Sequence, residues 1–249
     1  GTSARSYDDE RWAKLNRDNL KLCRSLGHEV VLACAICLRN LEEAKRQLAP
    51  RDMREAQDAL PALVSVAEAL GRPEMIEAIR TRAQDDLEGL RLAAYYGCQL
   101  WRDETKRILD DRPIERIVEA LGGESAEWFG STTCCGGPVG YAASEALTCI
   151  ERVLGAAQDA RAQAIVTICP LCHLQLDARQ DELTATRGRL FRIPVFHLTE
   201  LVGIVLGVEE AETWIRRHLT SVMELIFALD RERQKAKNEG DDGEHGEPR

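Results

Sequence analysis

Five cysteines in the second half of the chain are spaced in a way that suggests metal chemistry. Cys98 is followed after 35 residues by the adjacent pair Cys134 and Cys135, and after 33 more by Cys169-Pro-Leu-Cys172. A lone Cys-x-x-Cys would fit a zinc knuckle or a redox turn, but a single cysteine, a doublet and a Cys-x-x-Cys in this order have few structural explanations. Five thiolates that meet at one point would need a centre with several soft metal ions.

The composition is that of an ordinary globular protein. The chain has 249 residues, 44% of them hydrophobic and 30% charged, and a net charge of -9. This charge argues against a nucleic-acid partner, which would need clustered Lys and Arg. No apolar run approaches the roughly 20 residues of a spanning helix, and no secretory signal is present. We therefore expect a cytoplasmic protein with no direct membrane span, whose nine cysteines stay reduced.

Short apolar runs alternate with helical patterns from residue 90 onward. The runs cover 90–96, 126–129, 164–168 and 193–197, and the helical stretches cover 113–121, 139–159 and 171–184. This alternation predicts an α/β fold with Rossmann-like parallel βαβ sheets. The five cysteines follow the first three runs, so we expect them at the carboxyl ends of strands, where open α/β sheets bind ligands.

An internal repeat extends this pattern to the start of the chain. Residues 30–37, which end in Cys34-Ala-Ile-Cys37, match residues 165–172 at an offset of 135. The repeat predicts two copies of one unit, with the first incomplete. The counterpart of the doublet would fall just before Gly1, so we expect the missing segment to have carried one cysteine and a doublet. A degenerate first unit is the alternative.

The predicted domain organisation follows from this repeat. Residues 1–49 are the C-terminal part of the first unit, 50–88 a helical connector, 89–230 the complete second unit, and 231–249 a disordered tail without apolar pattern. Within the second unit, an amphipathic helix is expected at about 210–229. We expect this helix to pack on the body of the protein or on a partner subunit.

Spacing helps to choose among the metals that thiolates bind. A structural zinc ion takes four ligands from two chelating pairs, and adjacent cysteines do not easily direct both sulfurs at one tetrahedral ion. The doublet suits two different irons. Gly136 and Gly137 then predict a tight turn whose backbone N–H groups approach sulfur. Trp128 and Phe129, before the doublet, are expected either to shield the sulfurs from water or simply to fill the core.

The remaining cysteines and two histidines have ordinary explanations. Cys149 lies in the apolar pattern of a helix and is expected to be a small buried hydrophobe, as is Cys23. His173, next to Cys172, is a candidate proton donor, although a histidine on a helix surface is the commoner outcome. His197, at the end of an apolar run, is expected to be structural.

Four motifs carry a resemblance to a known family. Tyr95-Tyr96-Gly97-Cys98, Thr133-Cys134-Cys135-Gly136-Gly137, Cys169-Pro170-Leu171-Cys172 and Leu176-Asp177 resemble a CCG domain, the cysteine-rich domain of the catalytic, B-type subunit of heterodisulfide reductase and its bacterial relatives. The segments at 193–195 and 198–203 are similar to the C-terminal end of that family. The resemblance covers about residues 7–230, and the second motif is highly specific.

The resemblance implies a noncubane [4Fe-4S] cluster held by Cys98, Cys134, Cys135, Cys169 and Cys172. Cys34 and Cys37 match only the end of a first motif, which implies an incomplete second site for a cluster or zinc. The implied activity is that of an oxidoreductase acting on a sulfur group, which reduces or forms a disulfide. The implied partners are an iron-sulfur electron donor like the C-type subunit of those complexes, a flavoprotein like their A-type subunit, and a disulfide or thiol substrate.

Two other functions stay open from the sequence. Similar CCG subunits occur in complexes of the succinate, glycolate and lactate dehydrogenase type, where the cluster would relay electrons without touching a disulfide. A zinc-stabilised interaction domain is the third hypothesis. Because the chain has no G-x-G-x-x-G fingerprint for flavin or nicotinamide after a strand, either redox function requires a donor subunit.

Overall fold

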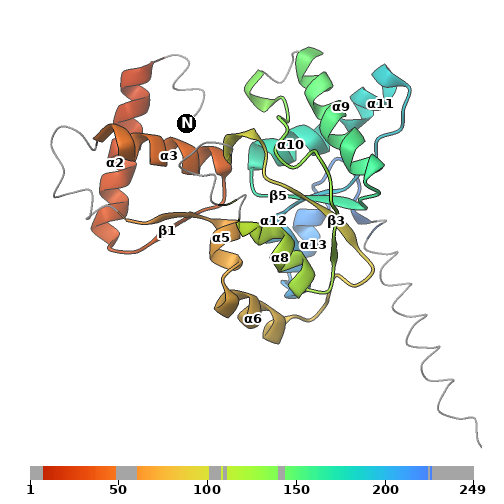
Figure 1. Ribbon diagram of the computed structural model, residues 1–249, viewed down its shortest axis with the longest axis horizontal. Helices are drawn as coiled ribbons and strands as arrows, with labels where there is room; N and C mark the ends of the chain where they lie inside the picture. Colours follow the sequence, from red (N-terminus) through yellow and green to blue (C-terminus); the bar gives the residue numbers. More distant parts are fainter. Residues whose placement is uncertain are drawn as a thin grey trace, which may run out of the picture.

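The protein has an α/β fold with two parallel sheets (Figure 1). The computed structural model describes residues 8–48, 61–100, 108, 111–139, 144–223 and 225. The first part contains α2 (Asp9–Leu26), β1 (Val30–Leu32), α3 (Ala35–Leu48), β2 (Leu63–Ser65), α5 (Val66–Leu70) and α6 (Pro73–Arg82). The second contains β3 (Arg91–Tyr95), the 3-10 helix η1 (Cys98–Leu100), α8 (Pro113–Ala120), β4 (Glu124–Ser125), the 3-10 helix η2 (Gly137–Val139), α9 (Ser144–Asp159), β5 (Ala164–Thr167), α10 (Pro170–Ala178), α11 (Gln180–Arg187), β6 (Val195–His197), α12 (Leu198–Val205) and α13 (Ala211–Ile215).

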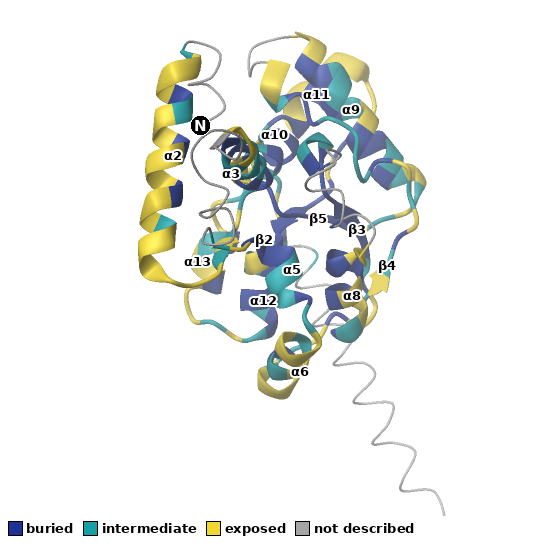
Figure 2. Ribbon diagram, turned by 60° about the vertical axis from the view of Figure 1, so that its left-hand side comes forward, coloured by how far each residue is buried: buried dark blue, intermediate teal, exposed yellow. Residues whose placement is uncertain are grey.

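The larger sheet has the strand order β4-β3-β5-β6, and all of its neighbouring strands are parallel. Every residue of β5 is buried, as expected of a central parallel strand covered on both faces. Helices α9 and α10 lie on one side of the sheet and α8 and α12 on the other (Figure 2). This arrangement confirms the predicted α/β class, and it brings the carboxyl ends of β3 and β5 together.

The smaller sheet pairs β1 with β2 in the same way that β5 pairs with β6. Val30 lies opposite Leu63 in the first pair, and Ile165 lies opposite Val195 in the second. In both halves a Cys-x-x-Cys helix follows the first strand, and a helix with a capping box follows its neighbour. A capping box satisfies two backbone N–H groups at a helix start, so the local sequence begins α5 and α12 where it does.

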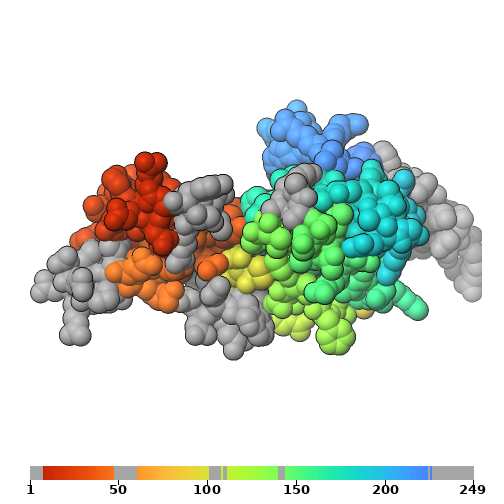
Figure 3. All heavy atoms as spheres, turned by 90° about the horizontal axis from the view of Figure 1, so that it is seen from above, coloured from red at the N-terminus to blue at the C-terminus, as the bar shows by residue number. Residues whose placement is uncertain are grey.

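Helix α2 covers the smaller sheet through a narrow apolar face. Asp8 caps its first turn, with its side chain accepting a hydrogen bond from Arg11 N at 3.0 Å, and Gly27 ends it in the left-handed conformation. Trp12, Asn16 and Leu20 are buried at intervals of one helical turn, while the opposite face is exposed (Figure 2). Seen from above, this first part lies beside the larger second part, with the yellow segment that leads into η1 between them (Figure 3).

Several elements differ from the boundaries that the pattern predicted. Residues 61–88 hold β2 as well as two helices, so the expected helical connector also contributes a strand to the smaller sheet. Residues 126–129 are irregular, because β4 ends at Ser125. The stretch at 171–184 is divided between α10 and α11. Of the expected helix at 210–229, α13 forms only the part from Ala211 to Ile215, and residues 216–221 are turns, bends and irregular backbone. The expected tail at 231–249 lies outside the described residues.

The C-terminal segment is held to the end of α10 by hydrogen bonds. The carboxylate of Asp177 accepts from Leu219 N at 2.8 Å and Thr220 N at 2.9 Å, and the hydroxyl of Thr220 donates to the Asp177 carbonyl at 2.9 Å. Among the described residues, every helix is too short or too polar to span a bilayer.

The turn before α9 requires glycine for two reasons. Gly136 has a φ of 79°, a conformation that strains residues with a Cβ atom. A Cβ atom placed there would also lie 2.8 Å from Ala146 Cα and 2.9 Å from Ala146 O in α9. This segment, which carries the cysteine doublet, therefore approaches the helix backbone more closely than any side chain allows.

Replacing Gly136 by alanine tests this close approach. We expect Gly136→Ala to lower the free energy of unfolding by about 2–4 kcal/mol, because backbone strain and a clash add together. Gly188→Ala is the matched control, since Gly188 has a φ of 67° but nothing within 4 Å of its Cβ position; its cost should be about 1 kcal/mol. Urea unfolding followed by circular dichroism measures both. Equal losses would contradict the close approach.

Candidate metal centre

Three segments of the second half bring cysteines to one place. Cys98 begins η1 just after β3, Cys169 is the residue before α10, directly after β5, and Cys172 lies in the first turn of α10. The doublet Cys134 and Cys135 lies in the irregular segment between β4 and η2. Neighbouring parallel strands end at the same edge of a sheet, so the fold itself places the first two segments together.

The sulfur atoms of these segments contact one another in pairs. Cys98 shares a side-chain hydrogen bond with Cys134, whereas Cys135 shares one with Cys172, which also bonds Cys169. The two adjacent cysteines of the doublet therefore face different partners. Sulfurs arranged in this way surround a region instead of converging on a point.

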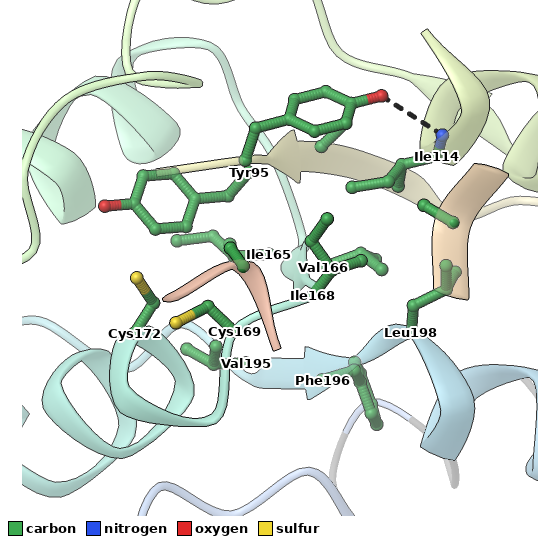
Figure 4. Close-up of a cluster of buried hydrophobic side chains, with 14 of the residues drawn as sticks. Tyr95, Ile114, Ile165, Val166, Ile168, Cys169, Cys172, Val195, Phe196 and Leu198 are labelled. Atoms are coloured by element: carbon green, nitrogen blue, oxygen red, sulfur yellow. Dashed lines mark hydrogen bonds between the residues drawn. The ribbon is translucent and has the colours of Figure 1, made fainter. Parts of the chain in front are cut away.

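Tyr95 lies at the centre of this arrangement. Its ring is buried, and its pKa is raised by burial and then by the charges of Cys172, Cys135, Cys98 and Cys134. One phenol is thus within electrostatic reach of cysteines from all three segments. Figure 4 shows Tyr95 with the sulfurs of Cys169 and Cys172 below it.

Glycines let sulfur and backbone come close together. Gly136 N donates to Cys134 Sγ at 3.3 Å. A Cβ atom on Gly97 would lie 3.1 Å from Cys172 Sγ, and one on Gly137 would lie 2.7 Å from Leu171 and 3.4 Å from Cys135 Sγ. Backbone N–H groups near sulfur tune iron-sulfur potentials, so the turn has the donor that such a centre uses.

Hydrogen bonds hold the doublet segment against the end of β3. The Tyr95 hydroxyl donates to Thr133 O at 2.6 Å, and Tyr96 N and Gly97 N both donate to Ser131 O, at 2.8 and 3.0 Å. Beside them, Trp128 Nε1 donates to Ala94 O at 3.0 Å. These bonds fix the distance between Cys98 and the doublet.

The two aromatic residues before the doublet behave differently. Trp128 is partly buried and packs against Tyr95, with ring centroids 6.0 Å apart. Phe129 is fully exposed, so the expectation that it shields the sulfurs or fills the core is wrong. The reason is that β4 ends early and the chain leaves the sheet before Phe129.

The thiols share protons, and their pKa values diverge within each pair. Hydrogen bonding from Cys98 lowers the pKa of Cys134 to about 6, and hydrogen bonding from Cys172 lowers that of Cys135. The donors Cys98 and Cys172 have raised pKa values, because each bonds a neighbouring sulfur and is buried. Two adjacent thiols cannot both ionise readily, but a bound cation replaces the shared protons.

Cys169 connects this group to the first half of the protein. The hydrogen bond from Cys172 acts to lower its pKa, but bonding to Cys34 and burial outweigh this and raise it to about 11. Cys34 in turn bonds both Cys169 and Cys37. The two Cys-x-x-Cys motifs, 135 residues apart in the sequence, thus meet at one site.

A side-chain bridge fixes α3 in this position. Gln99 Nε2 donates to Cys98 Sγ at 3.3 Å, and Arg39 Nη1, on α3, donates to Gln99 Oε1. Together with the contact between Cys34 and Cys169, the bridge holds α3 at two points. The repeat in the sequence identified both motifs, but nothing in it indicated that they would face each other.

Cys149 differs from its prediction as a buried packing residue. It is partly exposed on α9, and its side chain lies beside Cys134. Burial and then the charge of Cys134 raise its pKa. The sequence offered no signal for this contact beyond the residue type. Cys23, also partly exposed, lies on α2 in the first half.

A histidine–carboxylate network lies behind Cys172. His173 Nε2, one residue on, bonds Val195 O at 2.9 Å and lies 3.6 Å from Glu200, which also meets His218 at 3.4 Å. His173 is thus partly buried instead of lying on the helix surface. Burial opposes ionisation of Glu200, yet hydrogen bonds from His218 and from His197 N leave its pKa lowered. Because Glu200 also caps α12, this network is structural.

His197 is buried, as expected of a structural histidine. Its Nδ1 is 2.8 Å from the Thr199 hydroxyl and caps α12. Desolvation lowers its pKa, while the backbone of Ala33 and Ile168 acts in the opposite direction. These two residues precede Cys34 and Cys169, so His197 packs between the two Cys-x-x-Cys motifs.

The donor set fits an iron-sulfur centre. All nine cysteines are free thiols, and five of them surround Tyr95 and the glycine turn. Thiolates are soft ligands that bind iron-sulfur clusters, zinc and copper(I). Cys98, Cys134, Cys135, Cys169 and Cys172 are the residues that could hold such a group, with Cys34 and Cys37 next to them.

Comparison with known proteins is consistent with this site. Residues 92–177 match the family model of the cysteine-rich domain called CCG. The chain is 28% identical over 227 residues to the 8-methylmenaquinol:fumarate reductase membrane anchor subunit of Wolinella succinogenes, covering 84% of this chain and 78% of that protein.

Two relatives have names that include heterodisulfide reductase. The chain is 26% identical over 248 residues to the B-type subunit of the ferredoxin/F(420)H(2)-dependent CoB-CoM heterodisulfide reductase of Methanosarcina acetivorans, covering 90% of this chain and 81% of that protein. It is 26% identical over 225 residues to a protein of Archaeoglobus profundus that is named as similar to the same heterodisulfide reductase subunit, covering 82% of this chain and 75% of that protein.

A solved structure shares the fold. The crystal structure of a hypothetical protein from Helicobacter pylori aligns with 74% of this chain at a TM-score of 0.55 and 11% identity, and the chain spans 36% of its length. Residues 92–177 thus form a CCG cysteine-rich domain, in a chain that is similar to the B-type subunit of heterodisulfide reductase over most of its length.

Proposed function

We propose that this chain is the iron-sulfur subunit of an oxidoreductase complex that reduces or forms a disulfide, or acts on a related sulfur substrate. Cys98, Cys134, Cys135, Cys169 and Cys172 would hold a noncubane [4Fe-4S] cluster. The observation that carries the proposal is the divergence of the doublet: Cys134 bonds Cys98, and Cys135 bonds Cys172.

This divergence favours several metal ions over one. A single tetrahedral zinc ion requires four sulfurs at about 2.3 Å from one point. Sulfurs that pair off around a buried phenol instead suit a cluster in which adjacent cysteines bind different irons. The lowered pKa values of Cys134 and Cys135 also favour metal binding, since it is the thiolate that binds a metal.

The protein's own groups would position and tune the cluster. When bound, a cluster of this kind supplies one-electron transfer and affinity for a thiolate sulfur. Tyr95 and Trp128 exclude water from one side, and Gly136 N–H donates to a ligand sulfur. Burial and N–H donors are two of the factors that set cluster potentials. The fold therefore supplies the environment, and the cysteines supply the bonds.

Partners follow from the chemistry of electron supply. We infer that electrons reach the site from an iron-sulfur subunit fed by a flavoprotein, because the sequence has no nucleotide fingerprint of its own. An electron relay is the second candidate function. It is favoured by the similarity to the fumarate reductase subunit of Wolinella succinogenes, since transfer to fumarate needs no disulfide chemistry.

Substitution of a doublet cysteine tests the ligand assignment. We expect Cys135→Ser, purified anaerobically, to lose most of its iron and visible absorption, because serine is a poor ligand for a soft metal. Cys23→Ser is the matched control, since Cys23 lies on α2 in the first half, and it should keep the iron of the wild type. Iron analysis and absorption spectra measure both.

Equal iron in the wild type and Cys135→Ser would contradict the assignment. A colourless, iron-free wild type that carries zinc would favour the interaction-domain hypothesis instead.

Addition of thiol or disulfide distinguishes sulfur chemistry from relay. If the cluster acts on sulfur, the EPR spectrum of the oxidised protein should change when a small thiol is added, because a new sulfur enters the coordination of iron. Bovine serum albumin with the same thiol controls for signals from the additive. An unchanged spectrum, with full reduction by a chemical donor, would support the relay function.

A further inference from the structure

Cys34 and Cys37 form a second thiol pair that faces both the cysteine site and solvent. Cys34 immediately precedes α3, and its carbonyl accepts a hydrogen bond from Leu38 N at 3.0 Å. The two sulfurs hydrogen-bond each other across the first helical turn. Cys37 is exposed and Cys34 partly buried, so a small molecule can approach the pair from outside.

The same local structure exists at Cys169 and Cys172, but there both thiols are buried. The buried pair faces Tyr95, Cys135 and Gly97, which is where the proposed cluster lies. The exposed pair contacts that site at its edge, through the single bond between Cys34 and Cys169. Burial thus separates two motifs whose sequences match.

Helix α3 gives the exposed pair the properties of a reactive dithiol. Its 14 residues direct the positive end of the helix dipole at Cys34, and a cysteine at such a position is stabilised as the thiolate. The bridge from Arg39 through Gln99 to Cys98 holds the helix in place. The pair is therefore fixed beside the cysteine site and does not depend on a mobile loop.

We propose that Cys34 and Cys37 are a redox-active dithiol that exchanges with a low-molecular-weight disulfide and passes its electrons through Cys169. The link to Cys169 depends on the proposed cluster, whereas the dithiol itself does not.

The reaction balances as two exchange steps. The Cys34 thiolate attacks one sulfur of the disulfide RSSR, forming a mixed disulfide and releasing RS⁻. The Cys37 thiolate then attacks Cys34 Sγ, closing the Cys34–Cys37 disulfide and releasing the second RS⁻. The two protons of the dithiol pass to these products, which leave as two RSH. Two electrons, delivered singly by a reduced iron-sulfur protein, and two protons restore the dithiol.

Trapping with oxidised glutathione tests the exchange. In the anaerobic wild type, we expect peptide mass spectrometry after alkylation to find a Cys34–Cys37 disulfide. Cys37→Ser should accumulate glutathione on Cys34, because the resolving thiol is gone. Cys23→Ser should behave as the wild type. Absence of both the disulfide and the trapped adduct would overturn the proposal.

Metal content provides the second measurement. Cys34→Ser should keep the iron of the wild type; if it lost iron as Cys135→Ser is expected to, Cys34 would be a ligand and the dithiol role would be overturned. An iron-free wild type that still formed the Cys34–Cys37 disulfide would refute the cluster but not the dithiol.

Re-reduction tests the link through Cys169. Reduced methyl viologen, a one-electron donor, should restore free thiols at Cys34 and Cys37 in the oxidised wild type at least about tenfold faster than in Cys135→Ser, where the proposed cluster would be absent. Equal rates would overturn the electron path.

Discussion

Close packing of sulfur atoms is the constraint on which this structure depends. Parallel pairing of β3 with β5 brings Cys98 and the Cys169 motif to one edge, and the doublet segment closes the third side. Neighbouring thiols at such distances share protons, so that one member of each pair is a thiolate and the other is not. Only a bound cation can hold all of them as thiolates, because it offsets the repulsion of buried negative charges.

The surrounding fold keeps these sulfurs in place without contributing sulfur itself. Strand β5 is buried throughout, which fixes the start of α10 and hence Cys169 and Cys172. Tyr95 connects β3 to the doublet segment through its hydroxyl. Glycines at 97, 136 and 137 remove the side chains that would otherwise separate the three segments. Packing density in a protein interior makes each of these close approaches specific.

The two Cys-x-x-Cys motifs show how environment divides the roles of similar sequences. Each begins a helix after a parallel strand, so their local geometry is alike. The second is enclosed by the larger sheet and its helices, whereas the first opens to solvent at Cys37. A buried thiol pair suits a metal centre, and an exposed pair at a helix N-terminus suits thiol–disulfide exchange. Contact between Cys34 and Cys169 joins the two.

Local patterns in the sequence predicted much of the architecture. The runs at 90–96 and 164–168 became β3 and β5 because continuous apolar residues suit a strand buried on both faces. The run at 126–129 did not form a strand: β4 pairs with β3 only at Glu124 and Ser125, and apolar character alone does not specify a pairing partner. For the same reason β2 was missed, since its three residues gain stability only from pairing with β1.

Residue type and order in the chain determined the chemistry of this protein, because soft sulfur ligands in a set spacing limit which metals can bind. The sequence also identified the positive-φ glycine turn and the repeated motif. Only the tertiary structure decided that Cys34 meets Cys169, that Cys149 lies beside Cys134, and that Phe129 is exposed. These contacts join residues from separate segments, and their geometry depends on how sheets and helices pack, which no local pattern encodes.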